Sequence, residues 1–543
     1  MSAVDARVET RASGSEGGRA PSFGLALHVA AVVAALFALD PRVTTLERYA
    51  LVKEALLALV AIGLCVLGLA RRRPWRLDAI DALLVSIVAI DLAHVPFAID
   101  TDVARRGALV TAILAALARD LRGRSAASRA RLAAWALGLT TVAASLVVME
   151  AYGLVPRISL PSYAPGTTIG QRNNAGHVIA IALVVALAAY ARAGSRRILW
   201  ALAPLACALV LTRSRVAWWA LAIGIALGAL SWREVRTMAR AGVAALVASL
   251  GAVAPLVLRP VLSWRIESPY ADSAARMLDV THGSGLGRLT QGWTSLAIVR
   301  AHPLGVGAGH WALFYPSVAS SGDPTIHREA WAPLSRSCTS DLVGSLVERG
   351  IPGAALLLVL SVLVARESWR SDRVRAAGLA ALGVVATLDC LTSLATGAVA
   401  LALLLPAREQ GEPTLRAASA GARAVQVVAA TALALGLAGA PRAIERVQIA
   451  HAAEAASLAT TRALVARDPW NVPLRARLVD HAMFTSGCAE ARPWLDEILR
   501  LRPYLPRARS ERAGCTAPLA ARRAPEPDAR GTEGMLPRAD GIF

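Results

Sequence analysis

The side chains of this sequence best suited to chemistry are arginines at the edges of apolar segments. Arg172, Arg215 and Arg288 each begin or precede such a segment. A guanidinium carries a fixed fork of N–H donors that matches phosphate oxygens, so these side chains could bind a phosphate-bearing ligand. Anchoring at a membrane interface is the structural alternative for each of them.

A reaction that removes a proton also needs a titratable group within hydrogen-bond reach. Asp389 lies in an apolar run, where acids are costly and often functional, unless it lies in water at the tip of a hairpin. Asp341, His310 and His327 are further titratable residues that could take this role. The six cysteines show no C-x-x-C pair and no metal-ligand spacing. We therefore expect neither a metal nor a cofactor.

Composition indicates that a membrane positions these groups. The chain of 543 residues is 55% hydrophobic, with a mean hydropathy of +0.50. Segments of about 20 apolar residues can cross a bilayer, and they must do so as helices that satisfy their own backbone groups. We predict an all-α, polytopic transmembrane bundle of about 12–13 spans. The predicted spans are 23–40, 49–70, 78–97, 104–119, 132–153, 175–191, 197–212, 215–231, 240–259, 341–364, 376–391, 392–407 and 424–440.

The net charge of +20 predicts orientation and does not indicate nucleic-acid binding. Lys53 is the only lysine, and the arginines cluster in short loops between alternate spans. By the positive-inside rule these loops are cytoplasmic, in a multi-pass membrane protein. The loops that are then external, on the periplasmic side, are 41–48, 98–103, 154–174 and 260–340.

Residues 22–440 form the predicted membrane domain, and the segments before and after it differ from it in composition. Residues 1–21 read as a disordered cytoplasmic tail and 513–543 as a second disordered tail. Between 441 and 512, amphipathic helices are expected, and Asp468-Pro469-Trp470 is echoed by Arg502-Pro503-Tyr504 after 34 residues. That offset matches a tetratricopeptide (TPR) repeat, so we predict a TPR-like periplasmic region. Cys488 and Cys515 could form a disulfide there in an oxidising compartment.

The external loop 260–340 is long enough to be functional. Its portion 288–300 has apolar residues at helical spacing, as in a helix lying on a membrane surface. Gly305, Gly307 and Gly309 follow at alternate positions, where glycine permits backbone conformations and close approach that other residues do not.

Four motifs occur in order along one predicted face. They are GTTIGQRNNAGH at 166–177, LTRSRVA at 211–217, the stretch from Arg288 to HPLGVGAGH at 302–310, and SDLVGSLVERGIPG at 340–353; Leu388-Asp389 is a weaker fifth. Together they resemble the O-antigen ligase and Wzy-type polymerase family across roughly 166–407.

The resemblance implies a glycosyltransferase of the bacterial inner membrane that takes a glycan from undecaprenyl diphosphate and passes it to an acceptor hydroxyl on the periplasmic side, without a metal. The acceptor could be the lipid A core, a second glycan or a protein, and the TPR-like tail could bind a periplasmic protein. The family's usual histidine aligns with Thr339 here. Asp341, His310 and His327 are therefore the local candidates for the general base, and Asp341 ranks first because it lies two residues after that position. Two alternatives are a transporter or flippase of lipid-linked sugars, and a catalytically inactive assembly scaffold.

Overall fold

The structure is a computed structural model, and helices account for its regular elements throughout the described chain. The described residues are 23–41, 47–70, 78–160, 163–230, 232, 234–262, 264, 269–331, 337–408, 445, 448–449, 452, 456–469 and 471–516. The predicted tail 1–21, the predicted span 424–440 and residues 517–543 lie outside them.

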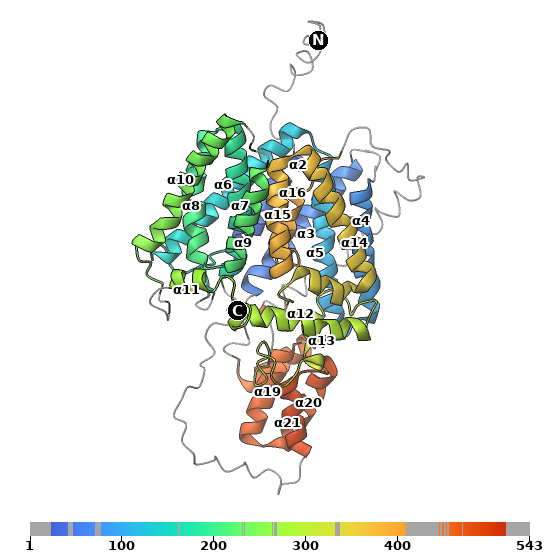
Figure 1. Ribbon diagram of the computed structural model, residues 1–543. Coiled ribbons are helices and arrows are strands. Elements are labelled where there is room, and N and C mark those ends of the chain that lie inside the picture. The colour runs from blue at the N-terminus through green and yellow to red at the C-terminus, as the bar shows by residue number, and fades with distance from the viewer. Residues whose placement is uncertain are drawn as a thin grey trace.

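Long helices standing side by side form the main body (Figure 1). They are α2 (Phe23–Phe37), α3 (Glu47–Ala70), α4 (Ala79–His94), α5 (Thr101–Arg122), α6 (Ala126–Ala151), α7 (Arg172–Ala193), α8 (Arg196–Thr212), α9 (Arg215–Ala229), α10 (Val235–Val257), α14 (Asp341–Ser371), α15 (Arg373–Leu388) and α16 (Ala395–Leu404). Every predicted span up to residue 407 therefore corresponds to a helix. Six helices in the described chain are long and apolar enough to cross a membrane.

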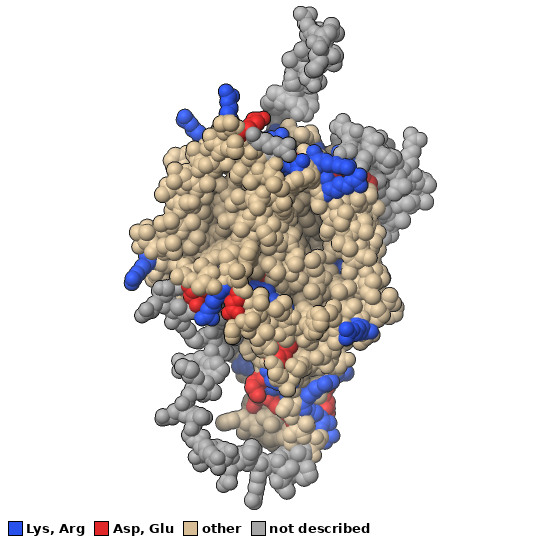
Figure 2. All heavy atoms as spheres, in the orientation of Figure 1, with Lys and Arg blue, Asp and Glu red and all other residues tan. Residues whose placement is uncertain are grey.

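The outer surface of this body is apolar, as expected of helices that face lipid. Figure 2 shows a broad band almost without charged side chains, with charges gathered above and below it. Large apolar side chains project from the band, including Trp200 (83% exposed) and Leu250 (65% exposed). Inside, small residues allow close packing: a Cβ on Gly251 of α10 would meet the Ala203 carbonyl of α8. The protein is a polytopic helical membrane protein.

The loops divide between the two ends of the bundle as the charge pattern predicts. At one end, Arg122 forms ion pairs with Asp78 (2.8 Å) and Asp81 (2.7 Å) and donates to the Pro406 carbonyl. The opposite end joins loops predicted to be external: the Asp100 N–H, in loop 98–103, donates to Nε2 of His310, in loop 260–340. Which end faces the periplasm remains the prediction made from the arginines.

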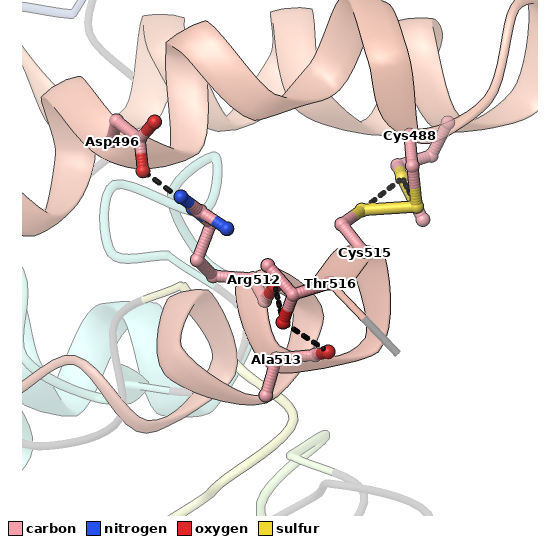
Figure 3. The surroundings of a disulfide bond; sticks show 7 residues. Cys488, Asp496, Arg512, Ala513, Cys515 and Thr516 are labelled. Carbon is pink, nitrogen blue, oxygen red and sulfur yellow. Dashed lines mark hydrogen bonds and ion pairs between the residues drawn. A yellow bond between two sulfur atoms is a disulfide. The ribbon is translucent and has the colours of Figure 1, made fainter. Parts of the chain in front are cut away.

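Four shorter helices form a separate unit below the bundle (Figure 1). They are α18 (Leu458–Arg467), α19 (Val472–Thr485), α20 (Cys488–Leu501) and α21 (Pro506–Thr516). Cys488 and Cys515 form the disulfide that the sequence allowed, linking the start of α20 to the end of α21 (Figure 3). Helix α21 thus continues four residues beyond the predicted boundary at 512, because the disulfide holds its last turn. Of the two Pro-containing repeats, Asp468-Pro469 lies in the α18–α19 turn and Arg502-Pro503-Tyr504 in the α20–α21 turn; assignment to the TPR family stays a prediction.

The lower unit contacts the membrane domain through its α20–α21 turn. The Arg502 guanidinium lies 2.8 Å from the Asp100 carboxylate, which is at the start of α5. The Tyr504 ring packs on Phe314 with 5.8 Å between ring centroids. The unit is therefore held against the end of the bundle that carries the large loop.

Candidate functional site

An amphipathic helix lies across that end of the bundle. Helix α12 (Gly283–Ala301) runs crosswise beneath the bundle helices (Figure 1) and contains the predicted helix 288–300. Its polar residues Gln291 and Ser295 face inward and are fully buried, whereas Leu289 and Trp293 are exposed. The exposed apolar side chains suit a helix at a membrane surface, and the buried polar side chains bond within the protein, Gln291 with Thr339 and Ser295 with Trp311.

The predicted residues Arg288 and Asp389 form an ion pair. Arg288 is on α12, and Asp389 is the first residue after α15. Nη2 of Arg288 donates a hydrogen bond to Oδ2 of Asp389, with 3.0 Å between nitrogen and oxygen. The same carboxylate oxygen lies 3.6 Å from Nε2 of His177 on α7. Three segments distant in the sequence thus converge on one carboxylate.

Arg215 joins this group through a serine hydroxyl. It is the first residue of α9, and its guanidinium donates to the Arg276 carbonyl and to the Ser284 hydroxyl. Arg288 Nη1 donates to the same hydroxyl at 3.4 Å. No carboxylate of the described chain forms an ion pair with Arg215, so the pair of guanidiniums is only partly compensated by Asp389. We call Arg215, Ser284, Arg288, Asp389 and His177 the arginine cluster.

Arg172 lies in a different setting. Its guanidinium stands 5.2 Å from the ring centre of Trp264, and Arg213 stands 4.6 Å from the same ring. Arg213 also pairs with Asp272 at 3.8 Å. Attraction between cations and the indole face brings the two arginines together around one ring. Arg172 is thus held at the start of α7, on the same helix as His177.

Asp341 supports the turn that carries Asp389. Its carboxylate accepts N–H groups from three successive residues, at 2.8, 2.7 and 3.2 Å, and its own N–H donates to the Asp389 carbonyl at 3.3 Å. The three donors are Leu391, Thr392 and Ser393. The Asp341 carboxylate is buried and its oxygens accept three backbone N–H groups. Asp341 therefore stabilises the structure of this turn.

Thr339 lies against the buried face of α12. Its hydroxyl donates to the Gln291 side-chain oxygen at 2.8 Å, and its N–H donates to the same oxygen at 3.3 Å. Gln291 is three residues after Arg288, so the position where the family has a histidine borders the arginine cluster. A threonine hydroxyl does not titrate in the ordinary range and cannot act as the base.

The three predicted glycines form a tight loop against α14. Gly305, Gly307 and Gly309 have φ values of 97°, 99° and 75°, in the region that favours glycine. A Cβ on Gly305 would lie 2.5 Å from the Glu348 carbonyl oxygen, and Gly350, with φ 67°, is packed as closely against Leu304. The glycines therefore let two backbones touch where α14 breaks at Gly350.

His310 completes this second group of contacts. It is fully buried, its Nδ1 is 3.0 Å from the Ala308 carbonyl, and its Nε2 accepts the Asp100 N–H at 3.1 Å. Burial lowers the pKa of His310. A neutral ring with its proton on Nδ1 satisfies both contacts. His310 therefore has a structural role: it joins the glycine loop to Asp100 at the start of α5. We call Gly305, Gly307, Gly309, His310 and Glu348 the glycine cluster; Glu348 accepts the Trp311 N–H at 3.4 Å.

One predicted site residue lies apart from both clusters, and four residues near the site were not predicted. His327 lies on an exposed part of the large loop. His177, Ser284, Gln291 and Trp264 were not predicted. For His177 a signal existed, because it is a lone histidine at the start of an apolar helix and ends the first motif.

The fold and the arginine cluster define a multi-pass membrane protein with its candidate site at one end of the helix bundle. Residues 200–358 match the family model Wzy_C, described as O-antigen ligase. That part of the chain is an O-antigen ligase domain, and it contains Arg215, Arg288, the glycine cluster and Asp341. A comparison with curated proteins found no match. The family places the protein among membrane glycan ligases and polymerases, with glycosyltransferase-like activity and with lipid-linked glycan and membrane lipid as partners.

Proposed function

We propose that this protein transfers or polymerises a glycan from an undecaprenyl-diphosphate-linked donor onto an acceptor hydroxyl at the periplasmic face of the bacterial inner membrane. The observation that carries the proposal is the arginine cluster inside the O-antigen ligase domain. Arg215 and Arg288 share one hydroxyl, and Asp389 is the only carboxylate in the arginine cluster, so the cluster has a net positive charge. Asp279 and Asp272 act on Arg215 from farther away, together with the cationic Arg276. Such a site favours an anion.

The diphosphate of the donor is the anion whose chemistry fits. When the sugar leaves, negative charge grows on the diphosphate oxygens, and fixed guanidinium donors stabilise that charge. Arg215 and Arg288 supply this role directly. Arg172 lies beside Trp264 at the start of α7, where it could contact a headgroup or glycan. The proposal assigns the positive charge to arginine and uses no metal.

Asp389 is the best-placed group to accept the proton of the acceptor hydroxyl. It pairs with Arg288, whereas Asp341 is occupied by backbone donors and His310 by the fold. The hydroxyl proton passes to an Asp389 oxygen, and the hydroxyl oxygen forms a bond to the anomeric carbon. The bond from that carbon to the diphosphate breaks, and its electron pair leaves with the diphosphate.

The C-terminal unit supports the orientation and suggests a partner. A disulfide between Cys488 and Cys515 is typical of the oxidising periplasm and rare in the cytoplasm. Since this unit touches the end that carries the arginine cluster, both belong to one side of the membrane. The TPR-like helices could bind a periplasmic protein, and the acceptor could be lipid A core, a glycan or that protein.

The test uses the native host with the gene deleted and complemented. We expect Arg215→Ala and Arg288→Ala each to abolish surface glycan assembly, while the protein remains in the membrane at normal level. Arg300→Ala is the matched control, because Arg300 is exposed on the same helix. Normal glycan ladders from both cluster variants would contradict the proposal.

Orientation needs a separate measurement. A cysteine placed at the exposed Ser320 should react with a membrane-impermeant maleimide in spheroplasts, in a background without exposed free thiols. Reaction only after lysis would place the large loop in the cytoplasm and remove the proposal.

Thr339 favours one alternative, an inactive assembly scaffold. The position of the family's histidine is taken by a hydroxyl bound to Gln291. A scaffold would retain its role in Asp389→Asn, and a transporter would leave the glycan on its lipid. Release of undecaprenyl diphosphate by the purified protein, lost in Asp389→Asn, distinguishes the proposed enzyme from both.

A further inference from the structure

A histidine lies inside the bundle directly behind the candidate site. His177 is fully buried on α7, and neither ring nitrogen has a hydrogen-bond partner in the described chain. The residues that follow it on α7 are apolar, from Val178 to Leu183. A buried imidazole without partners is costly, so packing alone does not account for it.

The charged group within reach of His177 is the carboxylate of Asp389. Nε2 lies 3.6 Å from Oδ2, which is beyond a normal hydrogen bond but requires only a small movement to become one. Arg288 occupies the same oxygen at 3.0 Å. Two basic side chains therefore approach one oxygen from opposite elements, α7 and α12, and only the arginine is bonded to it.

The other oxygen of Asp389 is held by the backbone. Oδ1 accepts the Cys390 N–H at 2.9 Å, and the turn itself is held by Asp341. The side chains that face Asp389 are thus Arg288 and His177; Cys390 is in the same turn, and Asp341, at the start of α14, is bonded to that turn. If Arg288 turned away, the carboxylate would be left with a single backbone donor in a largely buried place, which is unfavourable.

We propose that His177 is a positioning residue that replaces Arg288 as the partner of Asp389 when a lipid diphosphate binds. The inference rests on the proposed function. The diphosphate offers Arg288 several oxygens and draws its guanidinium from Asp389. His177 then donates its Nε2 hydrogen to Oδ2 and keeps the carboxylate in place. The lone pairs that Arg288 releases become free to accept the proton of the acceptor hydroxyl.

The experiment measures transfer and binding separately. Purified variants in nanodiscs are mixed with membrane extract from the deletion strain, which holds unused donor and acceptor, and the product is followed against the extract concentration. Binding is measured with undecaprenyl diphosphate alone. The variants are His177→Phe, which removes the donor, and His177→Gln, whose amide N–H can replace it.

The matched control is His28, a second buried membrane histidine. It lies 3.7 Å from Asp120, at the end of the bundle away from the arginine cluster, and is substituted in the same two ways. Since misplacing a reacting group typically costs on the order of 100-fold, we expect His177→Phe to lower kcat by about that factor. His177→Gln should recover most of this loss. Binding of undecaprenyl diphosphate and KM should stay within about twofold in both, because Arg215 and Arg288 are intact.

Two results would overturn the inference: kcat of His177→Phe equal to that of His28→Phe, or equal loss in His177→Gln and His177→Phe at equal melting temperature. If His177→Phe does not fold, a double-mutant cycle of His177→Gln with Asp389→Asn tests the inference instead. We expect the small loss of kcat that remains in His177→Gln in the wild-type background to vanish beside Asp389→Asn; additive losses contradict the inference. Wild-type activity in Arg215→Ala and Arg288→Ala would instead remove the proposed function itself.

Discussion

The arginine cluster and the glycine cluster lie at the same end of the bundle and differ in how completely their polar groups are satisfied. In the arginine cluster, Arg215 lacks a carboxylate partner and His177 lacks any hydrogen bond within the described residues. In the glycine cluster, His310 uses both ring nitrogens and Glu348 accepts from the neighbouring backbone.

This difference distinguishes residues suited to binding a ligand from residues that hold the fold. A cluster whose donors and acceptors already satisfy one another gains nothing from a ligand, whereas one with unpaired charge does. Both clusters contain motif residues of the O-antigen ligase domain. A motif residue can therefore have a structural role as readily as a catalytic one. The variants below test which of these roles each residue has.

The largest effect should distinguish two aspartates at one turn: Asp389, which lies in the turn, and Asp341, whose carboxylate holds that turn from the start of α14. Asp389→Asn should lower transfer by at least about 100-fold at unchanged melting temperature, because proton transfer by a positioned group contributes on that scale. Asp341→Asn should instead lower the melting temperature, since a neutral amide is a weaker acceptor for three backbone N–H groups. Its activity per folded molecule should stay within about tenfold. Equal activity losses in both variants would contradict the separate roles of Asp389 in the reaction and Asp341 in the fold.

Gly305→Ala should disrupt the glycine cluster through the fold. The residue has φ 97°, and its Cβ would lie 2.5 Å from the Glu348 carbonyl oxygen. We expect the free energy of unfolding to fall by about 2–4 kcal/mol, with activity per folded molecule kept. Gly292→Ala is the control, because it lies on α12 with open space at its Cβ. A stable but inactive Gly305→Ala would assign the loop to substrate binding.

Removing the disulfide should affect the C-terminal unit alone. Cys488→Ser should destabilise this unit by about 3 kcal/mol, as expected for opening a loop of 27 residues. Limited proteolysis in spheroplasts should then cut the unit faster, while transfer by the membrane domain continues. Cys515→Ser and the double variant should behave identically. Unchanged proteolysis after reduction would show that the disulfide does not hold the unit.

The smallest effect should be a pH dependence of the glycine cluster. Burial lowers the pKa of His310 below its unfolded value of about 6.5. The folded state therefore binds fewer protons than the unfolded state, and stability is full above about pH 6.5 and declines as the pH falls below it. The melting temperature of the wild type should drop toward pH 5 more than that of His310→Asn. Parallel curves would show that the ring is not held neutral.

Much of the fold follows from periodicity and charge in the sequence. Apolar length predicted the bundle helices α2–α10 and α14–α16, and the arginine-rich loops predicted which of them share an end. The helix that contains Arg288 was visible from its apolar spacing, and Cys488 and Cys515 were visible as a pair. These are local signals, so a single chain suffices to read them.

The sequence by itself determined the class of this protein: a helical membrane protein with motifs of the O-antigen ligase family. Only the tertiary structure decided which motif residues meet. Arg288 and Asp389 are 101 residues apart and form one ion pair, while His310, close to Arg288 in sequence, is enclosed by Asp100 and the glycine loop. His177 gained its interest from the same folding. Spacing reports which residues share a helix face, but convergence of α7, α12 and α15 depends on packing between segments, which no local pattern encodes.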